Sequence, residues 1–322
     1  MTVAFDTDHD VVYGAVDQLS PLIRRVTANN PSKFTFRGTG TYIVGTGDHV
    51  AIIDPGPRDD DHVAALLAAV EGEHVTHVLI THTHGDHSPA AAAVVAATGA
   101  TTYGFGPHPP DAVSEADQAA PDTDDEPVDP EEAARRAEQA EQERPDTDFV
   151  PDEVVGDGDR ISGAGWSIEC VHTPGHISNH LCFALAEESA LFSGDHVMGW
   201  STTIIPPPDG DMAAYLGSLR LVAHRAERVY YPTHGAAITN PVPYVESLLA
   251  HRLDREQQIL DHLSLGPATI PDMVAALYAD VPEELHRPAA RSVRAHLVQL
   301  VAEDRIGSDA GEATADATYS RH

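Results

Sequence analysis

The chain of 322 residues contains very little cysteine and no long hydrophobic run. Its two cysteines, Cys170 and Cys182, are too few for a disulfide framework, and both stand in strand-like runs, which predicts buried, inert thiols. No apolar run approaches the ~20 residues that a membrane-spanning helix needs. The first residues, MTVAFDTDHD, lack the basic and apolar regions of a secretory signal. We therefore expect a cytoplasmic protein that does not interact with a membrane.

Basic residues are also scarce. Lys and Arg number 19, with Lys33 as the single lysine, against 51 Asp and Glu, so the formal net charge is -32. Such a chain repels itself and other polyanions in dilute buffer. At molar salt the Debye length falls to ~3 Å, which largely screens that repulsion. The composition resembles that of proteins from salt-loving archaea. A low-salt protein that avoids nucleic acid is the alternative, so net charge is a weak guide to partners.

Strand-like and helical patterns alternate between residue 41 and about residue 240. Apolar runs bounded by turn residues predict strands within 41–54, 75–80, 101–105, 159–173, 180–187, 189–195 and 228–232. Helical spacing of apolar residues predicts helices at 59–70, 89–100 and about 211–224. This alternation is typical of a layered α/β domain, which we expect to cover residues 1–240.

Three segments, one within this domain and two after it, differ from the rest in composition or pattern. Residues 111–148 contain 15 acidic residues and four prolines but almost no bulky apolar side chain, which predicts a surface insertion. Residues 241–310 show helical spacing in PVPYVESLLAHRLDREQQILDHL and in two later stretches, which predicts a small helical domain. The small polar residues of 311–322 predict a flexible tail.

The densest group of potential metal ligands is in LITHTHGDHSP, residues 79–89, directly after an apolar run. Residues i and i+2 of an extended segment face the same side, so His82 and His84 can bind one ion. Gly85 permits a sharp turn, after which Asp86 and His87 can face a second ion. Imidazoles with a carboxylate suit Zn²⁺ or a similar metal.

More ligands are needed for two ions, and three other stretches can supply them. HTPGHISNH offers His172, His176 and His180, LFSGDH places Asp195 after an apolar run, and VYYPTHG does the same for His234. Carboxyl ends of strands are where α/β sheets commonly bind ligands. From the residues alone, the division of these candidates among the ions stays open.

Taken in order, THTHGDH, TPGH, SGD and HG resemble the metallo-β-lactamase superfamily of hydrolases, which implies a four-layer αββα sandwich. The resemblance implies two Zn²⁺ ions, or another divalent metal such as Mn²⁺ or Fe²⁺, with a bridging hydroxide that attacks the substrate. It also implies that Asp86 orients this nucleophile or accepts its proton, and that Asp195 bridges the ions. The implied ligands are His82, His84 and His176 for one ion and Asp86, His87 and His234 for the other.

Two further residues are expected to orient or support the ligands without binding metal themselves. Asp54 in IIDPG matches a buried aspartate of the superfamily that orients a ligand histidine, although a turn-capping role is the alternative. His180 is expected to be buried or to support a ligand rather than to bind metal.

The C-terminal helices and NNPSKFTFRGTGTYIVGTG (29–47) resemble the beta-lactamase-like protein 2 subgroup, which implies a winged-helix-like C-terminal domain. This chain has Gly40 where that subgroup has Asn in G-T-N-T-Y. Arg287, Arg291 and Arg294 share one helix face, which could contact phosphates or be a solvated surface.

Three functions are consistent with these patterns. The leading one, by resemblance, is an endoribonuclease that cleaves single-stranded RNA. The alternative is a glyoxalase II-like thioesterase (hydroxyacylglutathione hydrolase-like) with a small-molecule substrate, although glyoxalase II usually ends in a different helical domain. A nucleic-acid-binding regulator with a residual metal site is the third. The physiological substrate and the oligomeric state stay open.

Overall fold

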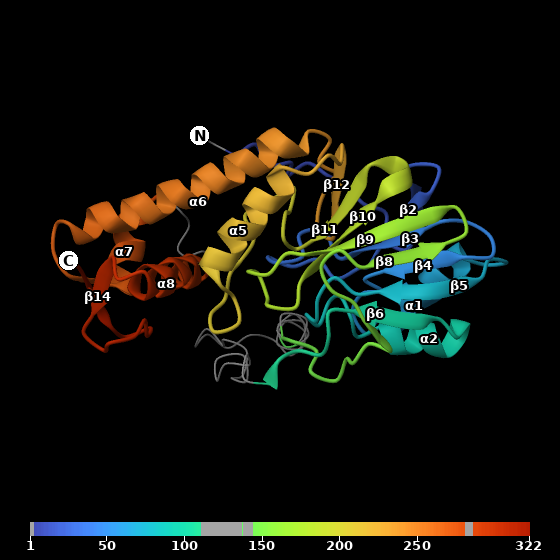
Figure 1. Ribbon diagram of the computed structural model, residues 1–322, viewed down its shortest axis with the longest axis horizontal. Helices are drawn as coiled ribbons and strands as arrows, with labels where there is room; N and C mark the ends of the chain where they lie inside the picture. The colour runs from blue at the N-terminus through green and yellow to red at the C-terminus, as the bar shows by residue number, and fades with distance from the viewer. Residues whose placement is uncertain (1–2, 111–136, 138–143, 281–285) are drawn as a thin grey trace, which may run out of the picture.

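The computed structural model describes residues 3–110, 137, 144–280 and 286–322, where two β-sheets pack face to face with helices outside them (Figure 1). The seven strands of the first sheet follow the order of the chain: β1 (Val16–Gln18), β2 (Ile23–Thr27), β3 (Gly40–Val44), β4 (Val50–Ile53), β5 (Val75–Leu79), β6 (Thr101–Gly104) and β7 (Glu153–Val154). The second sheet has the order β12-β11-β10-β9-β8. Its strands are β8 (Arg160–Gly163), β9 (Trp166–His172), β10 (Leu181–Leu185), β11 (Ala190–Gly194) and β12 (Val229–Pro232).

Three hydrophobic layers hold the sandwich together. Side chains of both sheets, among them Tyr42, Phe183 and Phe192, fill the space between the sheets. Helices α1 (Asp60–Ala69) and α2 (Ala91–Thr98) cover the outer face of the first sheet. Helices α5 (Met212–Ala223) and α6 (Pro241–Leu263) cover the second sheet. The chain therefore folds as α, β, β and α layers.

Local signals explain where the helices begin and end. The carboxylate of Asp59 accepts hydrogen bonds from two backbone amides at the start of α1, which satisfies donors that the helix leaves free. Helix α2 ends at Gly99, which adopts a left-handed conformation with φ 74°. Both cysteines lie in the second sheet, where burial raises the pKa of each thiol to about 12.

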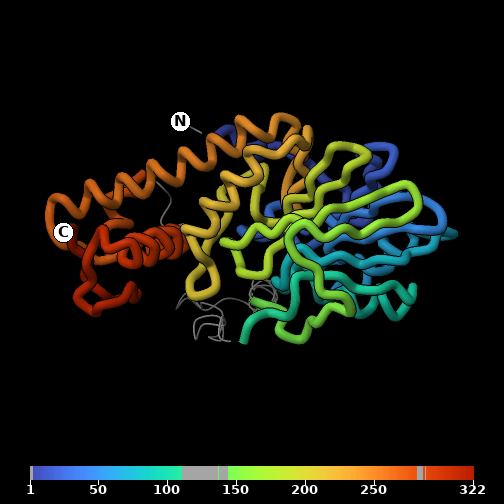
Figure 2. Tube along the Cα trace, in the orientation of Figure 1, coloured from blue at the N-terminus to red at the C-terminus, as the bar shows by residue number. Residues whose placement is uncertain are grey.

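The C-terminal unit contains the predicted helices and, in addition, a small sheet that the sequence did not indicate. Helices α7 (Ile270–Leu277) and α8 (His286–Ala302) pack with a small sheet in the order β13-β15-β14. Its strands are β13 (Ala268–Thr269), β14 (Ile306–Ser308) and β15 (Thr318–Arg321). Figure 2 shows α6 extending from the sandwich into this unit.

The last residues of the chain form a strand, so the expectation of a flexible tail over 311–322 is wrong there. Strand β15 lies at the centre of the small sheet, and its Tyr319 is fully buried. It pairs with the nearby β14 and with β13, which lies far before it in the sequence, and a strand of four residues gives little local signal. Strands β1 and β2 were also not predicted, because β1 has only three residues, all exposed, and Arg24 and Arg25 interrupt the apolar pattern of β2. Most of the predicted insertion at 111–148 falls outside the described residues.

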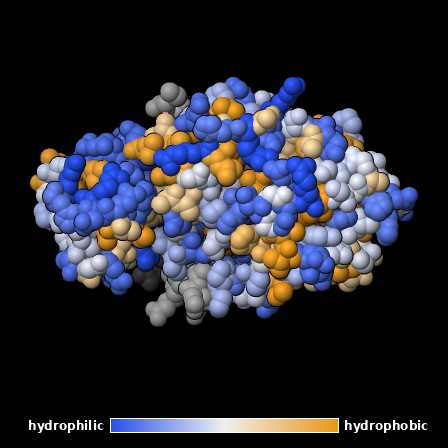
Figure 3. All heavy atoms as spheres, in the orientation of Figure 1, coloured by the Kyte–Doolittle hydropathy of each residue, from blue (hydrophilic) through white to orange (hydrophobic). Residues whose placement is uncertain are grey.

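Within the described residues, no helix has the length and hydrophobicity to cross a membrane. The face shown in Figure 3 is a mosaic, with separate hydrophobic patches among hydrophilic residues.

The contribution of α6 to the core can be tested with two leucines of that helix. Leu248 is 2% exposed within the cluster that joins α5 and α6, whereas Leu253 is 40% exposed. L248A leaves a cavity and is expected to lower the free energy of unfolding by about 2–5 kcal/mol. L253A is expected to change it by about 0.5 kcal/mol or less. Urea denaturation followed by circular dichroism measures both, and equal shifts would contradict this packing.

Candidate metal centre

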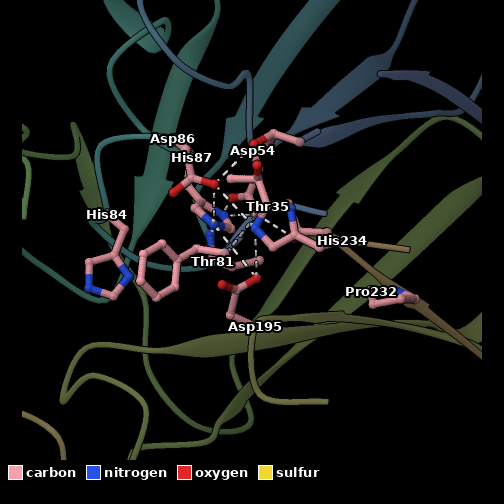
Figure 4. A network of polar contacts seen from close by, with 12 residues as sticks. Thr35, Asp54, Thr81, His84, Asp86, His87, Asp195, Pro232 and His234 are labelled. Atoms are coloured by element: carbon pink, nitrogen blue, oxygen red, sulfur yellow. Dashed lines mark hydrogen bonds and ion pairs between the residues drawn. The ribbon is translucent and has the colours of Figure 1, made fainter. Parts of the chain in front are cut away.

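Loops at one edge of the sandwich bring together all seven side chains that the resemblance implies as ligands. Figure 4 shows His84, Asp86, His87, Asp195 and His234 among them. The seven side chains follow strands β5, β9, β11 and β12, so residues far apart in the sequence meet at neighbouring strand ends. Six of the side chains are buried and His84 is half-buried. They form three overlapping groups: His82, His84 and His176; His82, His87 and Asp195; Asp86, His87 and His234.

Three imidazoles converge in the first group. The Nε2 atom of His82 lies 2.9 Å from Nδ1 of His84, and Nε2 of His176 lies 3.0 Å from the same atom. Burial, together with the neighbouring imidazoles, lowers the pKa of His82 and His84 well below the usual value, and burial lowers the pKa of His176. The rings are therefore neutral and direct their nitrogens at a common point, as ligands of a borderline metal do.

The carboxylates of Asp86 and Asp195 lie among the other imidazoles. Nε2 of His234 is 3.1 Å from Asp86 Oδ2 and 3.4 Å from Asp195 Oδ1. Nε2 of His87 is 3.4 Å from Asp86 Oδ2. On the side of the first group, Asp195 Oδ2 is 3.8 Å from His176 Nε2. Asp195 therefore stands between the group of His82, His84 and His176 and the group of Asp86, His87 and His234. This is the position that the resemblance implies for a bridging ligand.

The outer nitrogens of these imidazoles are anchored to the protein. Nδ1 of His176 donates to the carbonyl of Ile204 at 2.6 Å, and Nδ1 of His234 donates to the carbonyl of Gly38 at 3.2 Å. A proton on Nδ1 leaves the lone pair of a neutral ring on Nε2, which faces the centre.

Among the residues that the structure describes, two buried polar atoms at the centre find no hydrogen-bond partner, namely Nε2 of His87 and Oδ1 of Asp195. Buried polar atoms are normally satisfied, so such a pair needs an explanation. A divalent cation would satisfy both, and the imidazole and carboxylate donors suit it chemically. The residues present therefore fit a metal centre.

The two carboxylates also change the protonation of their neighbours. Burial alone would lower the pKa of His234, but Asp195 and Asp86 outweigh it and raise that pKa to about 10. The same opposition raises the pKa of His87 well above its usual value. Burial would raise the pKa of Asp86 and of Asp195, yet the facing imidazolium groups lower both. Without metal, protons balance the buried negative charge.

Asp54 lies behind His87, as the sequence analysis predicts for a residue that orients a ligand. Its Oδ2 accepts from His87 Nδ1 at 2.9 Å, from the Thr81 hydroxyl at 2.7 Å and from the Thr233 hydroxyl at 3.2 Å. Its backbone has φ 50°, an uncommon conformation for a residue other than glycine. Several contacts therefore fix a strained aspartate whose carboxylate sets the orientation of His87.

His180 is fully buried beneath Asp195. Its Nε2 accepts a hydrogen bond from the backbone N–H of Asp195 at 3.2 Å, and its Nδ1 lies 2.8 Å from the hydroxyl of Thr173. Burial lowers its pKa well below the usual value, so the ring is neutral. His180 thus supports the backbone of a candidate ligand, in line with its expected position.

Sequence reasoning missed the contact that orients Asp86. The hydroxyl of Thr39 donates to Asp86 Oδ2 at 3.0 Å. The side-chain oxygen Oδ1 of Asn30 accepts a hydrogen bond from the Thr39 backbone N–H at 2.8 Å. Thr39 lies in the GTGTY stretch that carries the subgroup resemblance, so a signal was available there. No local pattern indicates that Gly85 N donates to the carbonyl of Arg144, a residue within the predicted insertion, at 2.8 Å.

The predicted nucleic-acid face lies apart from this centre, on α8. Arg291 is exposed and Arg294 is half-buried. The side chain of Arg287 lies outside the part of the chain that the structure describes. Contact of this face with nucleic acid stays a prediction.

Comparisons with known proteins agree with this fold. Residues 35–234 match the family model of the metallo-beta-lactamase superfamily, and residues 269–313 match the beta-lactamase associated winged helix domain. The lactamase-like protein vrtG of Penicillium aethiopicum is 31% identical over 312 residues, covering 93% of this chain and 87% of that protein. An atrochrysone carboxyl ACP thioesterase of Aspergillus chevalieri is 29% identical over 301 residues, covering 90% and 84%.

Solved structures show the same fold over nearly the whole chain. A beta-lactamase domain protein from Burkholderia ambifaria has a TM-score of 0.75 at 18% identity, covering 98% of this chain and 96% of that one. A metallo-beta-lactamase family protein from Thermus thermophilus has a TM-score of 0.70 at 23% identity, covering 94% and 100%.

The chain therefore belongs to the metallo-β-lactamase superfamily. It has the metallo-β-lactamase fold with a C-terminal winged helix domain, so the predicted fold class is confirmed. The prediction of a metal-dependent hydrolase agrees with the superfamily. The finer subgroup and the halophilic origin stay predictions.

The central position of Asp195 can be tested by D195N. This change removes a charge that faces His87 and His234, so we expect metal and activity to be lost together while the fold is retained. D48N makes the same charge change at an exposed residue and is expected to alter neither. Elemental analysis and circular dichroism check the outcome. Full metal content and activity in D195N would remove the bridging assignment.

The raised pKa values predict that metal binding depends on pH. Below its pKa of about 10, His234 of the metal-free protein carries a proton on a ring that must be neutral to bind a cation. Protons therefore compete with metal, so the affinity for Zn²⁺ should rise as pH rises through the neutral range. Calorimetry in buffers of different ionisation enthalpy should detect released protons. A pH-independent affinity without proton release would contradict the prediction.

Proposed function

We propose that this protein is a metal-dependent thioesterase that hydrolyses an acyl group carried on a thiol. The observation that carries the proposal is the similarity of this chain to relatives that are named as thioesterases. Relatives from three species, at 29–31% identity, bear the name atrochrysone carboxyl ACP thioesterase, and the match covers 82–90% of this chain. The matches from Aspergillus chevalieri and Paecilomyces divaricatus extend over 90% of this chain. The thioesterase therefore takes the place of the endoribonuclease as the leading hydrolase function.

The donor set suits hydrolysis of such a bond. We infer two Zn²⁺ ions, one at His82, His84 and His176 and one at Asp86, His87 and His234, with Asp195 between them. Divalent ions supply Lewis acidity that activates water and polarises a carbonyl oxygen. The protein holds the imidazoles of the first group neutral and fixes the direction of His176 through the backbone carbonyl of Ile204.

Asp86 is the residue proposed to accept a proton from the attacking water. Thr39 and His234 contact its Oδ2, which fixes the carboxylate at the centre. A thiol has an ordinary pKa of about 8.5, so it departs readily as a thiolate and needs no dedicated acid. Hydrolysis of a thioester therefore demands less of the site than hydrolysis of a substrate whose leaving group must be protonated.

RNA cleavage is the second candidate, and the winged helix domain is the observation that favours it. A domain of this kind can contact phosphates, and Arg291 is exposed on α8. The proposed regulator without catalysis is weaker, because all seven candidate ligands come together.

The assay should compare both substrate classes on one preparation. Protein purified in molar KCl, to screen its charge of -32, would be analysed for metal and given acyl-N-acetylcysteamine, S-lactoylglutathione and a fluorogenic single-stranded RNA. Thioester hydrolysis that chelator abolishes and Zn²⁺ restores is the expected result, with D195N inactive. Chelator-sensitive RNA cleavage without thioester hydrolysis would overturn the proposal in favour of a nuclease.

A further inference from the structure

Arg252 connects three helices with the loop beside the metal centre. It lies on α6 and is 4% exposed. One arm of its guanidinium, Nη1, donates to the hydroxyl of Ser292 on α8 at 3.2 Å, and the other, Nη2, donates to the backbone carbonyl of Thr203. Its central carbon lies 5.5 Å from the centre of the Tyr215 ring on α5.

The loop that Arg252 holds positions two of the candidate ligands. The hydroxyl of Thr203 donates to the backbone carbonyl of Asp195 at 2.7 Å. The next residue, Ile204, offers its carbonyl to Nδ1 of His176 at 2.6 Å. Movement of the backbone at 203–204 would therefore change both the direction of the His176 ring and the support of Asp195. Contacts of this kind around a metal commonly control affinity.

The same loop has a second link to the helices. The hydroxyl of Tyr215 donates to the carbonyl of His196 at 3.2 Å, and the Thr203 hydroxyl lies 3.2 Å from that carbonyl. The guanidinium of Arg252 therefore contacts the loop directly at Thr203 and also packs on Tyr215, the residue that holds the loop at His196.

The charge of Arg252 has a physical consequence. A guanidinium stays protonated, and burying it is costly unless its donors are used. Because the guanidinium is charged, the hydrogen bonds that it donates to the Ser292 hydroxyl and the Thr203 carbonyl are charge-assisted. His296 on α8 is fully buried, and burial together with Arg252 lowers its pKa to about 3, so it adds no second positive charge.

We propose that Arg252 is a positioning residue that makes the C-terminal unit part of the metal-holding apparatus. Through Ser292 it fixes α8, and through Thr203 it fixes the backbone that orients His176 and Asp195. Its rigid two-armed fork can join two elements in this way, whereas a lysine ammonium is a single point. The proposal does not depend on which substrate the enzyme cleaves.

Arg255 provides a matched control on the same helix. It donates to the side chain of Gln258 at 2.7 Å and to the carbonyl of Leu277 at 3.1 Å, and it lies 4.1 Å from the centre of the Tyr278 ring. These contacts join α6 to α7 and do not involve the loop at 195–204. R255M therefore removes an arginine, a hydrogen bond to a carbonyl and a ring contact, as R252M does, without reaching the ligands.

The test compares metal binding by the full-length variants. Chelator competition gives the affinity for Zn²⁺, and the absorption spectrum of the Co²⁺-loaded protein reports the ligand geometry. R252M is expected to lower the affinity by about 10- to 100-fold and to change the spectrum. R255M is expected to leave both unchanged. R252K keeps a donor for Thr203 but loses the fork, so its affinity should lie between those of R252M and the wild type.

Urea unfolding of the metal-free proteins separates these effects from a general loss of stability. Wild-type affinity and spectrum in a folded R252M would overturn the proposal, and so would an equal loss in R255M. If R252M does not fold, R252K decides by the same readouts: a loss larger than that of R255M supports the proposal, and wild-type values reject it. Failure here leaves thioester hydrolysis by the wild type untouched, so the two proposals can fail separately.

Discussion

The burial of two carboxylates, Asp86 and Asp195, among five imidazoles is the constraint around which this protein is arranged. Charged groups are stable out of water only when cations or hydrogen bonds compensate them. In the metal-free protein, protonated His87 and His234 provide that compensation, which explains their raised pKa values. A divalent cation can replace those protons at the same atoms. The polar loops, the anchored imidazoles and the packed sheets all maintain this arrangement.

Hydroxyl groups and backbone carbonyls do much of the positioning. Asp54 is fixed by Thr81 and Thr233, which come from loops of different sheets, and in turn fixes His87. The orientation of this imidazole therefore depends on how the two sheets pack. Fixing side chains before substrate arrives reduces the reorganisation needed during reaction.

The C-terminal unit takes part in this arrangement as well as in the fold. Helix α6 packs on α5 in a shared hydrophobic cluster, which also includes Ala295 of α8. Arg252 adds a polar connection from that interface to the loop after β11. Winged helix domains often recognise nucleic acid. In this protein the contacts of Arg252 also give the domain a structural role close to the metal centre. The two roles involve different surfaces and are compatible.

The sequence by itself determined the alternation of strands and helices, the clustered ligands after β5 and their partners in the later motifs. These features are local, since apolar spacing and short motifs do not depend on distant residues. The tertiary structure decided that β15 is a central strand, that Thr233 reaches Asp54 179 residues away, and that Arg252 reaches Thr203. Such contacts depend on packing geometry between elements, which periodicity along one chain does not encode.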